Sequence, residues 1–203
     1  MADPNCGDLA AGIPVDCDFL PIGGTEPNIL LIKKTEWDLA VTNATITFDG
    51  TSPNLITATV LTSGDKGYLI EGYENQTKPI VTGIKRASGY RYKQTIDFLA
   101  IGGKAAIEKI VKDMGNQRFV VIYKNLFKDE DGEGKYKVFG VEAGLKRPEG
   151  GAELDKYNDV DGVWMLKLES EEFALESTPQ YSFYNTDEAT TDAEFVTLQS
   201  AAA

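Results

Sequence analysis

Residues 118–143 read RFVVIYKNLFKDEDGEGKYKVFGVEA, and this stretch decides the fold class. Its first part is almost continuously apolar, its middle is polar and rich in Gly, Asp and Glu, and its last part returns to strand-forming residues. Two strand patterns around a Gly-rich polar tip predict a long β-hairpin. Because an isolated hairpin is marginal in water, we expect its apolar side chains to need a partner sheet. These side chains belong to Phe119, Val121, Tyr136, Val138 and Val141.

The segment just before the hairpin has the apolar period of a helix. Over residues 103–114, one side carries Ile107, Ile110, Val111 and Met114, and the opposite side carries charged residues. A glycine follows and supplies a C-terminal stop. We therefore predict one amphipathic helix that packs its apolar face on a sheet.

The rest of the chain is dominated by short strand patterns separated by turn signals, with a spacing typical of sandwiches and barrels. In the run 163–176 the large apolar residues change sides, which predicts a β-bulge or bend near Ser170. The fold class we predict is β-rich α+β, an antiparallel β-sandwich or barrel with one flanking helix and extended terminal arms. The upstream strand patterns cover residues 29–33, 45–48, 55–61, 68–72 and 79–99.

The chain divides into an irregular N-terminal arm (1–28), a single β-rich domain (29–176) and a C-terminal tail (177–203) that adds an edge strand or an inter-subunit arm. Charge is uneven, with a net value of −5 over residues 1–32, +4 over 33–148 and −11 over 149–203. The weakly periodic ends cannot build a core of their own, so we expect their apolar anchors to contact neighbouring subunits. These anchors are Phe19, Leu20, Tyr181, Phe183 and Phe195.

Composition excludes several classes of enzyme. The 203 residues contain no histidine, which rules out Ser-His-Asp triads, Cys-His dyads and His-ligated zinc. With 32 acidic and 20 basic residues, the net charge of −12 repels a polyanion such as DNA. The chain also lacks a recognisable nucleophile motif. We expect a structural subunit without catalytic turnover and without a cofactor.

The N-terminal segment lacks the basic start and apolar run of a secretory signal. No stretch approaches the roughly 18 consecutive apolar residues of a membrane span. We therefore expect a product of the cytoplasm with no membrane partner. In that reducing compartment Cys6 and Cys17 are expected to be free thiols, with a disulfide between them as the alternative.

The tip of the predicted hairpin offers one candidate metal site. Asp129, Asp131 and Glu133 alternate along the loop and could offer oxygen ligands to Ca²⁺. The spacing does not match an EF-hand loop, and no helices are predicted on either side. We therefore favour a solvated turn and expect no bound metal.

Taken together, these features resemble the tail tube (major tail) proteins of tailed bacteriophages. The resemblance covers about residues 29–198 and rests on the helix segment AAIEKIVKDMG, the hairpin RFVVIYKNLFKDEDGEGKYKVFGVEAG, the β-rich pattern and the irregular ends. Proteins of that family form stacked hexameric rings whose hairpins close a continuous inner β-barrel. The tubes of contractile injection and type VI secretion systems share the fold.

The resemblance implies a homo-oligomeric virion protein, assembled in the host bacterial cytoplasm, with other tail or connector proteins as partners and DNA only as transient cargo. The hairpin 118–143 would line the ring wall. Glu133 and Glu142 would face the bore, where carboxylates repel DNA phosphates. Two alternatives stay open: a capsid-decorating or head-tail connector protein, and a monomeric binding or hydrolytic module.

Overall fold

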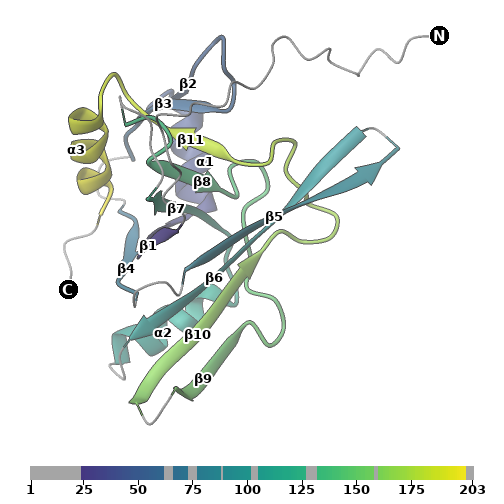
Figure 1. The fold of residues 1–203 in the computed structure, drawn as a ribbon, viewed down its shortest axis with the longest axis vertical. Helices are drawn as coiled ribbons and strands as arrows, with labels where there is room; N and C mark the ends of the chain where they lie inside the picture. Colours follow the sequence, from purple (N-terminus) through teal and green to yellow (C-terminus); the bar gives the residue numbers. More distant parts are fainter. Residues whose placement is uncertain are drawn as a thin grey trace.

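The computed structural model describes residues 24–61, 66–72, 77–87, 89–101, 105–126, 132–157 and 160–199. Two β-sheets and three helices make up this part of the chain (Figure 1). The elements are β1 (Thr25–Lys33), α1 (Lys34–Thr42), β2 (Ile46–Phe48), β3 (Leu55–Thr59), β4 (Tyr68–Ile70), β5 (Lys78–Arg86), β6 (Gly89–Ile101), α2 (Ala105–Met114), β7 (Phe119–Asn125), β8 (Tyr136–Phe139), β9 (Ala152–Tyr157), β10 (Val160–Glu169), β11 (Tyr181–Phe183) and α3 (Glu188–Leu198).

The larger sheet has seven strands in the order β2-β3-β11-β8-β7-β1-β4, and the smaller has four in the order β5-β6-β10-β9. All strand pairs are antiparallel except β11 with β3, which is parallel. The predicted β-rich α+β fold is confirmed. Its sheets are not purely antiparallel as predicted, because β11 returns from the far end of the chain and enters the larger sheet beside β3.

The central strands of the larger sheet are buried on both faces. Leu30 and Ile32 of β1 belong to a core that faces α1 and α3, whereas Ile29 and Leu31 belong to a core shared with the smaller sheet. Strands covered on both faces need apolar residues at every position instead of alternate ones. This explains why β1 and β7 have almost continuous apolar sequences.

The second core lies between the two sheets and is closed at one end by α2. Val111 and Met114 of this helix are buried there, and Ile110 is partly buried. Ile107 also belongs to α2, but its side chain is not among those that the structure describes. The helix packs against the sheets through the face that its period predicted.

Two further helices were not predicted. The sequence of α1 has a weak apolar period, and packing of Trp37 and Ala40 against the larger sheet holds it in place. The helix α3 is rich in Thr, but Asp187 precedes it, and the Asp187 carboxylate accepts a hydrogen bond from the Thr190 backbone N–H at 2.7 Å. This N-cap was the local signal available in the sequence.

The predictions for the two ends need correction. Residues 25–28, assigned to the N-terminal arm, already belong to β1. The C-terminal tail is neither an edge strand nor an extended arm, because β11 lies between β3 and β8 and α3 covers the first core. The prediction that tail anchors contact neighbours is therefore wrong for Tyr181, Phe183 and Phe195, which are 7%, 1% and 4% exposed within their own chain. Phe19 and Leu20 lie outside the described residues.

Candidate functional site

The hairpin predicted to line a ring wall is an interior part of the molecule. Its strands β7 and β8 pair with each other, and β1 and β11 occupy their outer edges. All five apolar residues named for it are buried, with exposed fractions from 0% to 7%. The partner sheet that the hairpin needs is supplied by two strands distant in sequence, so the prediction that neighbouring copies supply it is wrong. The hairpin residues concerned are Phe119, Val121, Tyr136, Val138 and Val141.

The two candidate bore carboxylates have different surroundings. Glu133 is exposed on the turn before β8. The Glu142 carboxylate accepts hydrogen bonds from the Ser177 backbone N–H at 3.0 Å and from the Tyr181 hydroxyl at 2.9 Å, and it also contacts the Ser177 hydroxyl. Glu142 thus holds the C-terminal segment of its own chain. The carboxylate predicted to face a bore therefore belongs to an exposed residue whose oxygens are bonded within their own chain.

The calcium candidate is only partly described, since Asp129 and Asp131 fall outside the described residues. Within the described residues, no group of three or more acidic or cysteine side chains is placed to hold a metal ion. The part of the candidate that can be located, Glu133, lies on an exposed turn.

A second glutamate completes a reciprocal arrangement with Glu142. The Glu176 carboxylate is fully buried and accepts hydrogen bonds from the backbone N–H groups of Glu142, at 2.9 Å, and Ala143, at 3.0 Å. Each glutamate therefore binds backbone next to the other, which joins the turn after β8 to the segment before β11. Burial raises the pKa of Glu176, and the nearby charge of Glu142 raises it further against the lowering effect of the two N–H bonds.

Substituting Glu176 with Gln is expected to change how stability depends on pH. A carboxyl group with a raised folded-state pKa contributes stability that is fully present below its unfolded pKa and is lost as the pH rises through its folded pKa. The wild type should therefore gain stability relative to Glu176→Gln on acidification from about pH 7 to about pH 4. Urea unfolding at a series of pH values would measure the difference, with exposed Glu172→Gln as the control. A difference that stays constant with pH would contradict the assignment.

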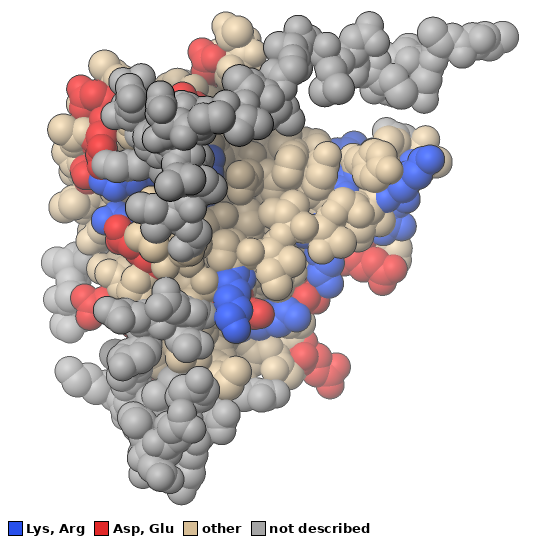
Figure 2. Space-filling view, viewed as in Figure 1, with Lys and Arg blue, Asp and Glu red and all other residues tan. Residues whose placement is uncertain are grey.

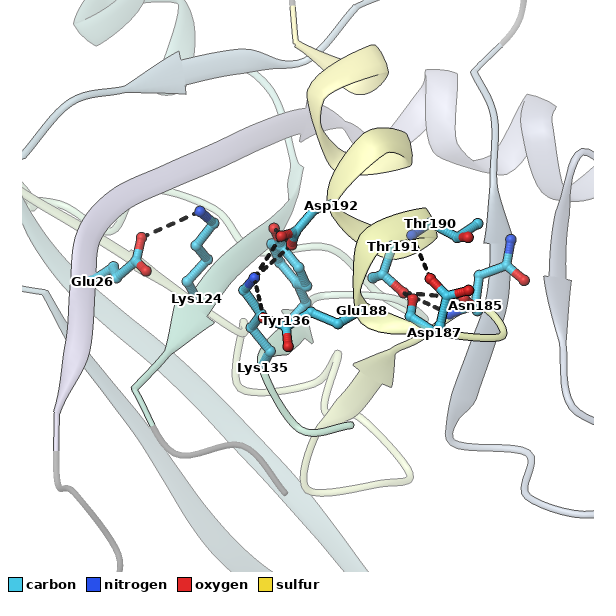
Figure 3. Close-up of polar contacts among 10 residues, drawn as sticks. All are labelled: Glu26, Lys124, Lys135, Tyr136, Asn185, Asp187, Glu188, Thr190, Thr191 and Asp192. Atoms are coloured by element: carbon cyan, nitrogen blue, oxygen red, sulfur yellow. Dashed lines mark hydrogen bonds and ion pairs between the residues drawn. The ribbon is translucent and has the colours of Figure 1, made fainter. Parts of the chain in front are cut away.

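A cluster of charged and aromatic groups fastens α3 to the hairpin (Figure 3). The Lys135 ammonium donates to Glu188 at 2.8 Å and to both Asp192 oxygens at 2.7 Å, and the Tyr136 hydroxyl donates to Asp192 at 2.6 Å. Burial works to lower the pKa of Lys135, but the bonds to Asp192 and Glu188 outweigh it and raise the pKa. For Asp192, burial works to raise the pKa, but the hydrogen bonds from Lys135 and Tyr136 outweigh it and lower the pKa.

The neighbouring Lys124 extends this cluster. Its ammonium lies 5.7 Å from the ring centre of Tyr136 and 5.6 Å from that of Phe195, and it is 3.4 Å from the Glu26 carboxylate (Figure 3). Cations over aromatic faces are stabilising. Because these groups are bonded to one another and join four elements of the fold, we assign the cluster a structural role. Sequence reasoning missed it because its members are separated by up to 169 positions, between Glu26 and Phe195.

The β5–β6 hairpin, called here the projecting hairpin, extends beyond the body of the molecule (Figure 1). None of the nine residues of β5 is buried. Ile80, Val81 and Tyr90 are 48%, 36% and 61% exposed. A long edge strand with exposed apolar side chains is a template for pairing with another strand.

The smaller sheet has a second open edge. Within the described residues, β5 pairs only with β6 at one end of the sheet, and β9 pairs only with β10 at the other. The two edges differ in sequence, KPIVTGIKR against AELDKY. A sheet with two different open edges on one chain can be continued in both directions by copies of the same chain.

Acidic and basic side chains gather on different parts of the surface. Figure 2 shows Lys and Arg gathered over the end of the projecting hairpin and Asp and Glu gathered over α3. The basic residues of that hairpin end are Lys85, Arg86 and Arg91, and the acidic residues around α3 are Asp187, Glu188, Asp192 and Glu194.

Comparison with protein-family models, curated proteins and solved structures found no match to this chain. Among the described residues, none of the helices has the length and apolar content needed to cross a membrane. The candidate functional site therefore rests on geometry alone, and it is the open-edged smaller sheet with its projecting hairpin.

Proposed function

We propose that this chain is a structural subunit that assembles with copies of itself into closed rings, as the tail tube proteins of bacteriophages do. The observation that carries the proposal is the smaller sheet with its two unlike open edges. Pairing β5 of one copy with β9 of the next would be a head-to-tail contact, which closes into a ring when the rotation between copies permits.

Ring closure would also resolve a feature that is unfavourable in an isolated subunit. Exposed backbone N–H and C=O groups along β5, combined with Ile80 and Val81, favour uncontrolled pairing. Natural sheets blunt such edges with bulges, short strands, cover from other elements, or Lys and Pro on the edge. In β5 the residues of the last kind lie only at the two ends of the strand, which leaves residues 80–84 open. A nine-residue exposed edge strand is instead expected where pairing is the function.

Segregated charge favours contact between unlike surfaces of two copies, although the acidic surface over α3 belongs to the larger sheet and is separate from the β9 edge. A basic projecting hairpin and acidic surfaces elsewhere on one chain attract each other between copies and help to set their orientation. The ring wall in this proposal is the smaller sheet and not the hairpin 118–143. The virion location and DNA passage through the ring are inferred from the resemblance alone.

Charging the β5 edge should prevent assembly without unfolding the subunit. Ile80→Lys combined with Val81→Lys places two charges on side chains that are already 48% and 36% exposed, so we expect a change of about 0.5 kcal/mol or less in unfolding free energy per site. Lysine on an edge strand opposes pairing. Negative-stain imaging and sedimentation velocity should show rings for the wild type and monomers for the double variant.

A matched control distinguishes the effect of lysine on the β5 edge from the effect of lysine at any exposed apolar position. Val60→Lys combined with Val196→Lys changes side chains that are 52% and 63% exposed and lie away from β5, so rings should form. A wild type that remains monomeric at high concentration would refute the proposal. Rings formed equally well by the β5 variant would refute this edge as the contact.

A further inference from the structure

A row of three charged side chains crosses the face of the smaller sheet that is turned away from the core. Ile96 and Phe98 of β6 are buried in the second core, so Asp97 between them lies on the opposite face. Lys78 of β5 and Lys167 of β10 are directly opposite Asp97 on its two neighbouring strands. Directly opposed residues share a face of the sheet. One carboxylate therefore lies between two lysine side chains.

The Asp97 carboxylate has not paired with either lysine. Its Oδ1 atom is buried and accepts no hydrogen bond. Among the residues that the structure describes, neither Asp97 nor Lys78 forms an ion pair. Lys167 instead lies 3.5 Å from Glu169, the last residue of β10 before the bend that the sequence predicted near Ser170. Opposite charges directly across a sheet ordinarily attract, and a buried oxygen without a donor is costly, so this separation is unusual.

A pocket of about 260 Å³ lies over the row. Beside the three charged residues, its lining includes Leu99 and Met165, which oppose each other on the same face and supply an apolar surface. A cavity of about 150 Å³ is sufficient to hold benzene, so this pocket has room for a somewhat larger molecule. Edge pairing uses backbone groups in the plane of the sheet, whereas side chains project above that plane. The pocket is therefore distinct from the β5–β9 contact, although one end of it reaches residues 150–151.

The order of charges in the pocket indicates what it can bind. An amine alone would satisfy Asp97 but would add a third cation beside Lys78 and Lys167. An anion alone would pair with the lysines but would leave Asp97 without a donor. A molecule that carries both an ammonium and a carboxylate satisfies both sides, because hydrogen bonds between charged groups are the stronger ones.

We propose that this pocket binds a free α-amino acid with an aliphatic side chain. Its ammonium donates to Asp97, its carboxylate accepts from Lys78, and its side chain packs on Met165, which is 41% exposed. An α-amino acid holds both charges on one carbon atom, which suits two residues whose Cβ atoms are roughly 5 Å apart across neighbouring strands. The site does not depend on self-assembly and is a further function of the chain.

Leucine and two of its analogues test the arrangement. Isocaproate lacks the ammonium of leucine, and isoamylamine lacks the carboxylate. Isothermal titration calorimetry with ligand up to about 10 mM should detect leucine, and each analogue should bind about tenfold or more weakly because it leaves one charged group of the pocket without a partner. Sedimentation velocity on the same samples would record the assembly state.

Two nearly isosteric variants assign the contacts. Asp97→Asn should lose the preference for leucine over isocaproate, and Lys78→Gln should lose the preference for leucine over isoamylamine. Damage to the fold would instead weaken all ligands alike. The matched controls are Asp113→Asn and Lys85→Gln, which lie outside the pocket and should keep both preferences.

Two results would overturn the site. The first is no detectable binding of leucine to the wild type at about 10 mM. The second is unchanged selectivity in Asp97→Asn and Lys78→Gln, with a double-mutant cycle in unfolding free energy that couples the two residues, since this would show that they pair with each other in solution. Either result would leave ring formation standing, and a wild type that forms no rings would leave the amino-acid site standing.

Discussion

Phe183→Ala is expected to destabilise the chain by about 3–5 kcal/mol, the usual range for removing a buried aromatic ring. Phe183 is 1% exposed, and its ring centre lies 5.9 Å from that of Tyr136 in the first core. It belongs to β11, whose neighbours on both sides are β3 and β8. The substitution leaves a cavity in the middle of the larger sheet, where neither water nor a surface side chain can replace the lost contacts.

Chemical denaturation at 25 °C would measure this effect, and Phe173→Ala provides the matched control. The same substitution at a side chain that is 94% exposed should change the free energy of unfolding by about 0.5 kcal/mol or less. If Phe183→Ala lowers the free energy of unfolding by less than about 1 kcal/mol and also impairs assembly, the C-terminal segment would instead act as an inter-subunit arm.

Gln94→Leu is the second substitution with a large expected effect, about 2–4 kcal/mol, because it leaves buried hydrogen-bonding groups without partners. The Gln94 side chain is fully buried in β6 of the smaller sheet. Its Oε1 accepts from the Gly140 N–H at 2.7 Å, and its Nε2 donates to the Pro179 carbonyl oxygen at 2.9 Å. One side chain thus joins the smaller sheet to the turn after β8 and to the approach to β11.

Nothing else can easily take the place of this link. Gly140 has a φ of 75°, and a Cβ there would lie 2.7 Å from the Phe119 carbonyl oxygen, so its backbone is held in a narrow space that only glycine fits. The half-buried Gln117, whose side chain forms no hydrogen bond within the described residues, is the control, and Gln117→Leu should have little effect. Denaturant midpoints would compare the two. Equal losses for both would show that Gln94 contributes through volume and not through its amide.

Local pattern was sufficient for several parts of the structure. The strand patterns in the regions of β1, β6 and β7, and the period of α2, each predicted the correct type of element at nearly the correct place. These features depend on which face of an element is apolar, and that information lies within a few neighbouring residues. The bend near Ser170 was predicted for the same reason.

Local pattern was insufficient for the helices α1 and α3. Trp37 and Phe195 are buried, but the apolar period around each is weak, and tertiary packing instead of intrinsic preference stabilises both helices. The ion pair of Lys135 with Asp192 and the reciprocal hydrogen bonds of Glu142 and Glu176 could not be predicted from the sequence either. Each joins groups that are 34 or more positions apart.

By itself the sequence determined that this is a β-rich chain with an amphipathic helix, an acidic surface and no histidine chemistry. Only the tertiary structure decided which strands are interior and which are edges. The hairpin 118–143 and the projecting hairpin both have the local pattern of paired strands, yet the first is enclosed by β1 and β11 and the second is open. The physical reason is that strand order depends on pairing between distant segments, and the hydrogen-bonding groups that pair are the same backbone groups in every strand.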